Sequence, residues 1–362
     1  MMKIGILTFH RAYNCGAVLQ AWALAAYIKK EFGFDTQVVD YGEIGTDNRK
    51  WLNLDSVYTF LVTCYCRMHD GGVEDVRRRK FERFARRFLP LSEKHSKVDL
   101  SNMDYTHLIV GSDQVWNLNL TQGDKTYFLD FETRTRRVAY AASFGVNKYD
   151  EAVEREVRQL LINFDSISVR EESGHQMVRR LTQQDVPLVV DPTLLHPIED
   201  YRPLERKPLM TPNRFVLLYT VCGHPWAGDV ADRLARERGM RVIHLHGGEP
   251  FRYHFPGRFR NIYAFGPAEF LWFFRHADCV VTNSFHGTAF SILNHKDMIV
   301  AANGSASDDR MKTLLDSCSL RDRMVSSPQE AVGWERVDWS NVDACIDRER
   351  RRAFAYLKGA LS

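Results

Sequence analysis

The stretch KIGILTFHRAYNCGAVLQAWALAAYIKKEF, residues 3–32, indicates the fold class of this 362-residue chain. It opens with a short apolar run that is typical of a buried strand, and the polar stretch 10–16 then interrupts this run. The following apolar side chains recur at helical spacing, at Val18, Leu19, Trp22, Ala25 and Ala26. The stretch therefore predicts a strand, a polar loop and a helix, in that order.

The same order of elements recurs along the chain. Helical patterns such as 267–277 lie between many of the predicted strands. Further strands are expected at 36–41, 106–112, 137–143, 165–170, 187–191, 214–221, 241–246, 261–265, 278–283 and 297–302. Strands that alternate with helices in this way are typical of a mostly parallel sheet with helices on both faces, so the sequence predicts an α/β protein.

Two domains are expected, because 362 residues exceed the size at which a single core usually keeps growing. Prolines at 192, 197, 203, 208 and 212 exclude regular structure between the two series of strands and mark the boundary. We expect an N-terminal domain at 1–195, a C-terminal domain at 196–339, and a last helix at about 340–362 that crosses back to complete the first domain.

Composition excludes several classes of protein. A net charge of +3 is too small to indicate a nucleic-acid partner, although a small anion remains a suitable ligand. The seven cysteines form no C-x-x-C pair, which argues against a disulfide framework or a zinc site and fits a reducing cytosol.

The N-terminus does not resemble a signal peptide, and no apolar run approaches the roughly 18 residues that span a bilayer. A cytoplasmic protein is expected. G-x-x-x-x-G-K and G-x-G-x-x-G are absent, so neither ATP nor NAD is expected as a cofactor.

Ligands of open parallel sheets bind beyond the carboxyl ends of the strands, where helix N-termini present unpaired N–H groups. The stretch NSFHG, residues 283–287, is a candidate of this kind: Asn283 or Ser284 can cap a helix, Gly287 leaves room for a ligand, and His286 lies in the first turn. A bound phosphate or carboxylate would raise the histidine pKa above about 6.5 and make the imidazole a proton donor. The alternative interpretation is a capping sequence whose histidine is satisfied within the protein, and the pattern alone does not decide.

Two more polar stretches follow strands. In GSDQVWN, residues 111–117, Ser112 and Asp113 offer hydrogen bonds and Trp116 offers a flat face, a combination that binds sugars. A turn with a core tryptophan is the alternative. In SVREESG, the planar guanidinium of Arg170 suits a carboxylate or phosphate, and an Arg–Glu surface pair is the alternative.

Two patterns have weaker implications. His244 and His246 share one face of a strand with Glu249 close behind, but no third ligand is evident, so we favour a polar cleft wall over a metal site. The basic run 77–87 carries phenylalanines at helical spacing and predicts an amphipathic helix with a solvated basic face. A second hypothesis for this run is docking to an anionic membrane surface or to a lipid-linked glycan.

Six stretches together resemble the polysaccharide pyruvyl transferase family: GILTFHRAYNCGAVLQAWAL, GSDQVWN, AYAASFG, SVREESG, VVDPTLL and TNSFHGTAFSIL. The resemblance implies a fold similar to B-type glycosyltransferases, with two facing Rossmann-like domains. It also implies transfer of pyruvate from phosphoenolpyruvate to a sugar of a bacterial surface polysaccharide or its precursor, as a cyclic ketal and without a metal or other cofactor. The donor would lie on the C-terminal domain and the glycan acceptor, free or lipid-linked, on the N-terminal domain.

The resemblance assigns a role to His286, which matches the catalytic and donor-binding histidine of the family. Our hypothesis makes His286 the acid or a phosphate ligand, Gly287 and Thr288 the phosphate cradle, and Arg170 the partner of the donor carboxylate. Many members carry arginine two residues before this histidine, where this chain has Ser284.

On the acceptor side, Asp113 would orient or deprotonate a sugar hydroxyl, with Ser112 and Trp116 as further contacts. Asn14 and Gly16, at the start of the first helix, are expected to contact donor or acceptor. Peripheral contact with the inner face of the membrane is a further expectation, and nucleic acid is not expected as a partner.

Two rival functions share the predicted architecture. One is a glycosyltransferase that uses a nucleotide sugar, and the other is a glycan-binding protein without catalysis, because a fold does not determine the chemistry of its site.

Overall fold

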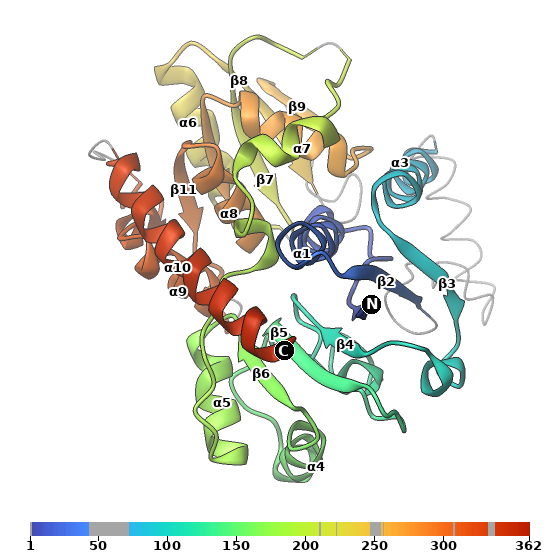
Figure 1. The fold of residues 1–362 in the computed structure, drawn as a ribbon. Helices are drawn as coiled ribbons and strands as arrows, with labels where there is room; N and C mark the ends of the chain where they lie inside the picture. Colours follow the sequence, from blue (N-terminus) through green and yellow to red (C-terminus); the bar gives the residue numbers. More distant parts are fainter. Residues whose placement is uncertain are drawn as a thin grey trace, which may run out of the picture.

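The computed structural model describes residues 2–42, 72–209, 211–221, 223–246, 255, 257–306, 308–331 and 337–362. The described residues form two six-stranded sheets whose paired strands are all parallel (Figure 1). The prediction of an α/β protein with mostly parallel sheets is therefore confirmed.

The first sheet has the strand order β3-β2-β1-β4-β5-β6. Its strands are β1 (Lys3–Leu7), β2 (Asp35–Tyr41), β3 (Leu91–His95), β4 (His107–Val110), β5 (Arg136–Ala142) and β6 (Ser166–Val169). Its connections contain helices α1 (Cys15–Phe32), α3 (Val73–Phe88), α4 (Glu151–Leu161) and the short η2 (Asp99–Asn102) and η3 (Thr126–Phe128); α5 (Glu172–Thr182) follows β6.

The second sheet has the order β12-β11-β10-β7-β8-β9. Its strands are β7 (Phe215–Thr220), β8 (Arg241–His246), β9 (Phe259–Ile262), β10 (Cys279–Thr282), β11 (Asp297–Ala301) and β12 (Met324–Val325). Its connections contain α6 (Ala227–Glu237), α7 (Pro267–His276), α8 (Phe285–Leu293), α9 (Asp308–Ser317) and η6 (Arg321–Arg323).

Three predicted details of the fold need correction. Residues 187–191 form only an isolated bridge from Leu188 to Val169, because Pro187 lacks an N–H donor at this edge of the sheet. β3 and β12 are strands that the sequence analysis did not predict. The proline-rich stretch is not irregular throughout, since η4 (Pro192–Leu194) and η5 (Ile198–Leu204) are 3-10 helices.

The last helix, α10 (Trp339–Ala360), runs from the second sheet back to the first (Figure 1). The Arg350 guanidinium donates to the carbonyl of Leu194 (2.7 Å), and the Tyr356 hydroxyl donates to the carbonyl of Ala139 in β5 (2.8 Å). No helix among the described residues is long and apolar enough to cross a membrane.

Helix α1 lies where the two halves of the molecule meet. A single cluster of buried side chains includes Leu19 of α1, Tyr201 of η5 and Phe270 and Phe290 of the second half. The rings of Tyr201 and Phe290 meet edge to face at 5.3 Å. This shared core holds the start of α1 beside the start of α8.

Candidate functional site

The start of α8 is closed by its own side chains. The Ser284 hydroxyl accepts from the N–H of Gly287 (3.4 Å), and the buried Thr288 hydroxyl donates to the Ser284 carbonyl (3.0 Å). A Cβ on Gly287 would lie 2.2 Å from the hydroxyl oxygen of Thr282, so this glycine faces its own strand. The structure therefore corrects the prediction that Gly287 and Thr288 form an open phosphate cradle, and the capping interpretation holds for Ser284.

Asn283 connects three loops of the second sheet. Its side-chain oxygen accepts from the N–H of Val221 after β7 (3.2 Å), and its nitrogen donates to Asn303 after β11 (3.0 Å). These bonds fix the carboxyl ends of β7, β10 and β11 relative to one another. Of the two residues predicted as a possible cap, Ser284 is therefore the cap of α8, and the Asn283 side chain is buried between the loops.

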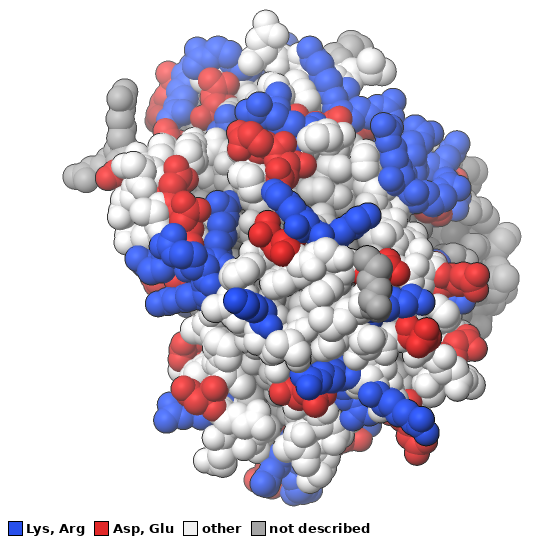
Figure 2. All heavy atoms as spheres, in the orientation of Figure 1, with Lys and Arg blue, Asp and Glu red and all other residues white. Residues whose placement is uncertain are grey.

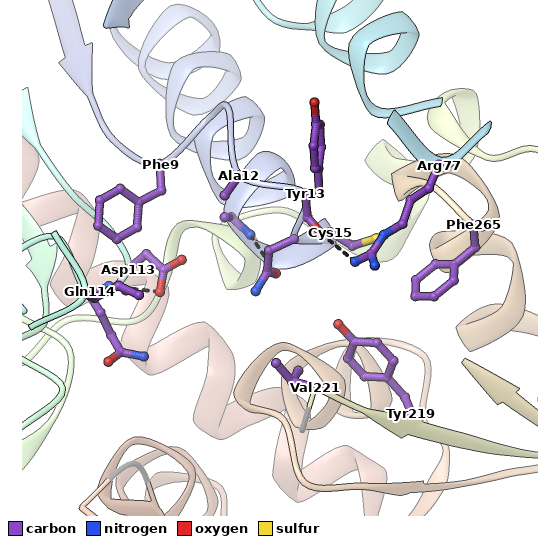
Figure 3. A pocket seen from close by; sticks show the side chains of 13 residues that line it. Phe9, Ala12, Tyr13, Cys15, Arg77, Asp113, Gln114, Tyr219, Val221 and Phe265 are labelled. Carbon is purple, nitrogen blue, oxygen red and sulfur yellow. Dashed lines mark hydrogen bonds between the residues drawn. The ribbon is translucent and has the colours of Figure 1, made fainter. Parts of the chain in front are cut away.

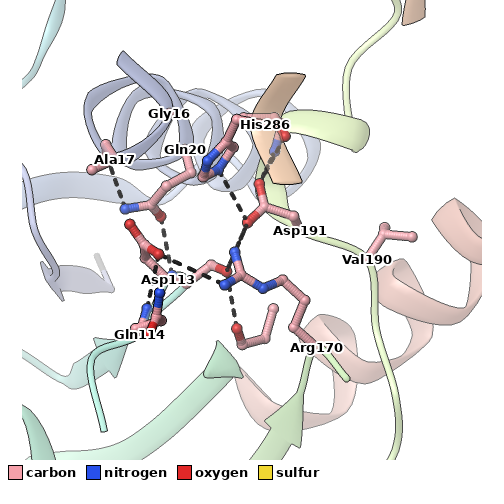
Figure 4. Close-up of polar contacts among 12 residues, drawn as sticks. Gly16, Ala17, Gln20, Asp113, Gln114, Arg170, Val190, Asp191 and His286 are labelled. Atoms are coloured by element: carbon pink, nitrogen blue, oxygen red, sulfur yellow. Dashed lines mark hydrogen bonds and ion pairs between the residues drawn. The ribbon is translucent and has the colours of Figure 1, made fainter. Parts of the chain in front are cut away.

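His286 meets the start of α1 from the other half of the molecule (Figure 4). A Cβ on Gly16 would lie 1.9 Å from its Nδ1 atom, so only glycine leaves room for the imidazole here. Asn14 caps α1 by accepting from the N–H groups of Gly16 (2.9 Å) and Ala17 (3.3 Å). Two helix starts, one from each half, thus enclose an imidazole that is 5% exposed.

A buried carboxylate, Asp191, lies beside this imidazole, with 3.7 Å between its Oδ2 and Nε2 of His286. The same oxygen accepts from Arg170 (2.7 Å) and from the hydroxyl of Ser112 (2.9 Å), and the other oxygen accepts from the N–H of Thr193 (3.0 Å). Burial alone would raise the pKa of Asp191, but His286 and Arg170 hold it well below its usual range. Ser112 is fully buried and supports Asp191, which corrects its predicted contact with substrate. Asp191 was not among the site residues predicted from the sequence, although it ends the strand-like VVD run ahead of a proline.

Arg170 is 4% exposed, which excludes the interpretation as a surface pair. Its Nη2 lies 3.7 Å from Asp113 and its Nε 3.7 Å from Glu171, and its guanidinium stacks 4.4 Å from the centre of the Phe285 ring. Burial disfavours this charge, yet the neighbouring carboxylates, Asp191 above all, raise the pKa of Arg170 above its usual value.

A second arginine near Arg170, Arg310 in the first turn of α9, also went unnoticed in the sequence. With its amide oriented to satisfy its neighbours, Gln114 accepts from Nη1 (3.0 Å) and Nη2 (3.1 Å) of Arg310. We call Asp113, Arg170, Glu171, Asp191, His286 and Arg310 the buried charge cluster.

Several atoms of the buried charge cluster lack hydrogen-bond partners. Among the described residues, buried side-chain atoms without a partner include Nε and Nη2 of Arg170, Oε2 of Glu171, Nε2 of His286 and Nε of Arg310. Buried polar groups are normally paired, so such a concentration in one place is unusual for a purely structural cluster. Burial also raises the pKa of Glu171, which favours its protonated form.

A cavity of about 260 Å³ adjoins the cluster through Asp113 and Gln114 (Figure 3). Arg77 of α3 lies at the opposite end, where it donates to the carbonyl of Tyr13 (2.7 Å) and stacks 5.8 Å from the centre of the Phe265 ring. The cavity is lined by Phe9, Ala12, Tyr13, Asn14, Cys15, Ala17, Arg77, Asp113, Gln114, Leu120, Tyr219, Val221 and Phe265. The cavity thus combines aromatic rings with one carboxylate and one guanidinium, whereas His286 lies behind its wall.

The basic run forms the amphipathic helix that the sequence predicts, with Phe81 and Phe84 buried. Arg77 departs from the prediction of a solvated basic face, because it is only 5% exposed and turns into the cavity. Burial raises the pKa of the neighbouring Cys15 thiol, which makes this cysteine a poor nucleophile.

Trp116 is the clearest correction among the predicted substrate contacts. It is fully buried, its indole N–H donates to the carbonyl of Tyr127 (3.0 Å), and it stacks on Phe128 at 5.5 Å between ring centres. The alternative of a core tryptophan is therefore correct, and no sugar can reach this ring.

The histidines of β8 bind neighbouring polar groups. The Thr220 hydroxyl lies 3.1 Å from Nε2 of His244 and 3.1 Å from Nδ1 of His246, and His244 also contacts Asn261 (2.9 Å). Glu249 lies outside the described residues. Among the residues that the structure describes, no group of three or more His, Cys, Asp or Glu side chains is arranged to hold a metal ion.

A sequence model of one family, polysaccharide pyruvyl transferase, matches residues 14–305. The chain belongs to the polysaccharide pyruvyl transferase family. The match includes both helix starts and most of the buried charge cluster, and it ends before Arg310. None of the curated proteins compared with the chain matches it.

Solved structures of nucleotide-sugar enzymes share the fold of this family member. UDP-GlcNAc 2-epimerase from Methanocaldococcus jannaschii has 10% identity and a TM-score of 0.54, covering 96% of this chain and 92% of that one. A putative UDP-N-acetylglucosamine 2-epimerase from Listeria monocytogenes has 10% identity and a TM-score of 0.52, covering 97% and 90%. The UDP complex of MnaA from S. aureus has 12% identity and a TM-score of 0.51, covering 98% and 91%. These likenesses establish the two-domain fold of B-type glycosyltransferases and no more.

Proposed function

We propose that the protein transfers pyruvate from phosphoenolpyruvate to two hydroxyls of one sugar in a bacterial surface polysaccharide or its precursor, forming a cyclic ketal and releasing phosphate. Membership of the family supports this function. The observation that carries it is the convergence of Arg170, His286 and Arg310 from both halves of the molecule, with unpaired buried nitrogens, beside a cavity lined by aromatic rings. Cations of this kind suit a donor that carries a phosphate and a carboxylate.

The chemistry balances without another reactant. An acid protonates the methylene carbon of phosphoenolpyruvate, which makes C2 electrophilic, and one sugar hydroxyl adds to C2. The bond between C2 and the phosphate oxygen then breaks, and the second hydroxyl closes the ring. The two hydroxyls release two protons in total, of which one replaces the proton given to the methyl group and one leaves with the phosphate.

In this proposal His286 is the acid or a phosphate ligand, and Asp191 orients its ring from 3.7 Å. The Nε and Nη2 atoms of Arg170, which have no hydrogen-bond partner, bind one anionic group of the donor, its carboxylate or its phosphoryl group. Because His286 lies behind the first turn of α1, the donor enters where the starts of α1 and α8 meet.

The acceptor sugar occupies the cavity. Its C–H faces pack against rings such as Tyr13 and Tyr219, while Asp113 orients or deprotonates a hydroxyl. Asp113 suits this role, because it lines the cavity and is also linked to Arg170 at 3.7 Å. The acceptor and the donor would therefore meet at this carboxylate.

The outer face of α3 supports peripheral contact with the inner face of the cytoplasmic membrane, where a lipid-linked acceptor would be available. Figure 2 shows basic side chains gathered over this helix, and its exposed arginines are Arg78, Arg79, Arg83, Arg86 and Arg87. We expect the protein to float with vesicles that contain anionic lipid and to lose this binding when Arg83, Arg86 and Arg87 become serine. Equal flotation with neutral vesicles would remove this part of the proposal.

The deciding experiment incubates the purified protein with phosphoenolpyruvate and a panel of β-galactoside and hexosamine acceptors. Mass spectrometry should find an acceptor heavier by pyruvic acid less one water, with one phosphate released per ketal. Sugar transfer from a UDP-sugar, together with no protection from thermal unfolding by phosphoenolpyruvate, would instead indicate a glycosyltransferase. Oligosaccharide binding without phosphate release would indicate a glycan-binding protein.

A further inference from the structure

Arg310 occupies a place that disfavours a positive charge. It lies in the first turn of α9, where the helix dipole is positive, and its Nε is buried without a hydrogen-bond partner. Burial and the nearby charge of Arg170 lower the pKa of Arg310 below its usual range. Arg310 as a whole is only partly buried, and a cation in such surroundings is stabilised by a nearby anion.

The residues around Arg310 compensate its charge only in part. Its two Nη atoms share one neutral acceptor, the amide oxygen of Gln114. The nearest carboxylates, those of Glu171, Asp113 and Asp191, also attract Arg170, and Asp191 is bonded directly to that guanidinium. The same three carboxylates therefore act on both guanidiniums, while the hydrogen bonds of the Arg310 Nη atoms go to a neutral amide.

The two guanidiniums come from opposite halves of the molecule. Arg170 follows β6 of the first sheet, and Arg310 belongs to α9 of the second half. Next to them α5 and α9 are in contact, since Asp309 accepts from the N–H of Ser173 (2.9 Å). Two like charges thus face each other across the boundary between the halves.

We propose that Arg310 and Arg170 bind one oxyanion between them across this boundary, and that an oxygen of the ligand takes the place of the Gln114 amide. The ligand class is a phosphate or phosphate ester. That this oxyanion is the phosphoryl group of phosphoenolpyruvate rests on the proposed function, whereas the anion site itself does not. Arg310 lies beyond the residues that match the family, so the match does not assign it this role.

An anion at this position has a mechanical effect. It contacts both halves at once and replaces repulsion between two cations by two charge-assisted interactions. Binding therefore stabilises the contact between α5 and α9, and loss of the anion weakens it. Release of phosphate at the end of the reaction would loosen the same contact.

The test measures thermal unfolding of the full chain at increasing concentrations of inorganic phosphate and of phosphoenolpyruvate. We expect both to stabilise the wild-type protein, and Arg310→Met to bind each about 10-fold to 100-fold more weakly, which corresponds to the loss of a charged hydrogen bond. Arg310→Lys should lie between, because an ammonium cannot make two parallel bonds. Lys312→Met is the matched control, since a residue two positions further along α9 faces another side of the helix.

A second variant keeps the test valid if Arg310→Met folds poorly. Gln114→Glu places a carboxylate next to the Arg310 guanidinium and nearly keeps the shape of the side chain at position 114. We expect this variant to raise the unfolding temperature of the ligand-free protein, because the new carboxylate pairs with Arg310. The same carboxylate should weaken phosphate binding, because it occupies the position of the anion. If folded Arg310→Met, or Gln114→Glu, binds phosphate as tightly as wild type, the inference is overturned.

The outcomes also separate this inference from the proposed function. Ketal formation that continues unchanged in Arg310→Met, with unaltered affinity for phosphoenolpyruvate, would overturn the anion site and leave the function standing. Phosphate binding that depends on Arg310, in a protein that makes no ketal from phosphoenolpyruvate, would overturn the function and leave the anion site standing.

Discussion

Two buried histidines lie at the same edge of the second sheet in different electrostatic surroundings. His246 ends β8, contacts the hydroxyl of Thr220, and lies near the positive charge of Arg77. His286 begins α8 and lies 3.7 Å from the carboxylate of Asp191. Burial, with a contribution from Arg77, lowers the pKa of His246 to about 4, so His246 is neutral near pH 7.

The charge beside His286 is held in place by the first half of the molecule. The partner of His286, Asp191, precedes the linker between the two sheets and is held by Arg170 and Ser112 of the first half. A neighbouring carboxylate favours the charged form of an imidazole, and a neighbouring cation or burial disfavours it. The contact between the two halves therefore places a carboxylate beside His286, whereas His246 lies near the guanidinium of Arg77.

The largest expected effect separates the two histidines directly. His286→Ala should reduce ketal formation by about 10²–10⁴-fold, the usual contribution of a positioned general acid. His246→Gln, a matched change of a buried histidine, should leave the rate within a few-fold of wild type. Phosphate release under saturating substrates measures both, and circular dichroism checks the fold. Full turnover in His286→Ala would end its assignment as the acid.

Removing the carboxylate of Asp191, the partner of His286, should have the second-largest effect, this time on stability. Asp191→Asn keeps the shape of the side chain but leaves the Arg170 charge buried without its closest carboxylate. We expect a loss of about 3–5 kcal/mol in the free energy of unfolding, as for other broken buried ion pairs. Urea denaturation at pH 7 measures this loss. A loss below about 1 kcal/mol, the range of surface pairs, would mean that the cluster is more hydrated than its burial indicates.

The glycines at the two helix starts offer a third test. In Gly16→Ala the new Cβ would overlap the imidazole of His286, so we expect about a 10²-fold loss of activity from displacement of the ring. In Gly287→Ala the Cβ would overlap Thr282 instead, and we expect mainly a loss of about 1–3 kcal/mol in stability. Comparing kcat per folded molecule with the free energy of unfolding distinguishes the two. The same loss of activity in both would contradict the difference between these two helix starts.

The smallest effect concerns His246 and pH. Below about pH 6.5 the unfolded chain binds a proton at this histidine, while the folded protein stays neutral down to a pKa of about 4. The free energy of unfolding should therefore decrease as pH falls through this window, by about 2 kcal/mol at pH 5. Urea denaturation at pH 7 and pH 5 should show a smaller decrease in His246→Gln than in wild type. Equal decreases would show that this histidine is protonated in the folded state.

Much of the fold could be predicted, because buried strands of parallel sheets are nearly continuous apolar runs. The stretches 214–221 and 278–283 are of this kind and became β7 and β10. β3, with the sequence LSEKH, was missed because it is partly exposed at the edge of the first sheet and carries no such run. Residues 187–191 have the apolar run but form only an isolated bridge, because the run begins with Pro187, which weighs against a regular strand.

The candidate site was less predictable, because its contacts join residues far apart in the sequence. The polar loops after strands identified Asp113, Arg170 and His286, which the fold brings into one cluster. Arg77 lay in a run dominated by exposed arginines, and only packing shows that it turns inward. Arg310 had no distinguishing pattern. Trp116 failed as a substrate contact because local sequence cannot tell a core ring from an exposed one.

Helix α10 affects the order in which the molecule can be completed during synthesis. Domains generally fold from the N-terminus as the ribosome extends the chain. Here α10 contacts β5 of the first sheet through the hydrogen bond of Tyr356 with Ala139, and this helix is translated after the whole second sheet. This part of the first sheet is therefore covered only after the second sheet has been made, and a nascent chain exposes that surface until α10 has emerged.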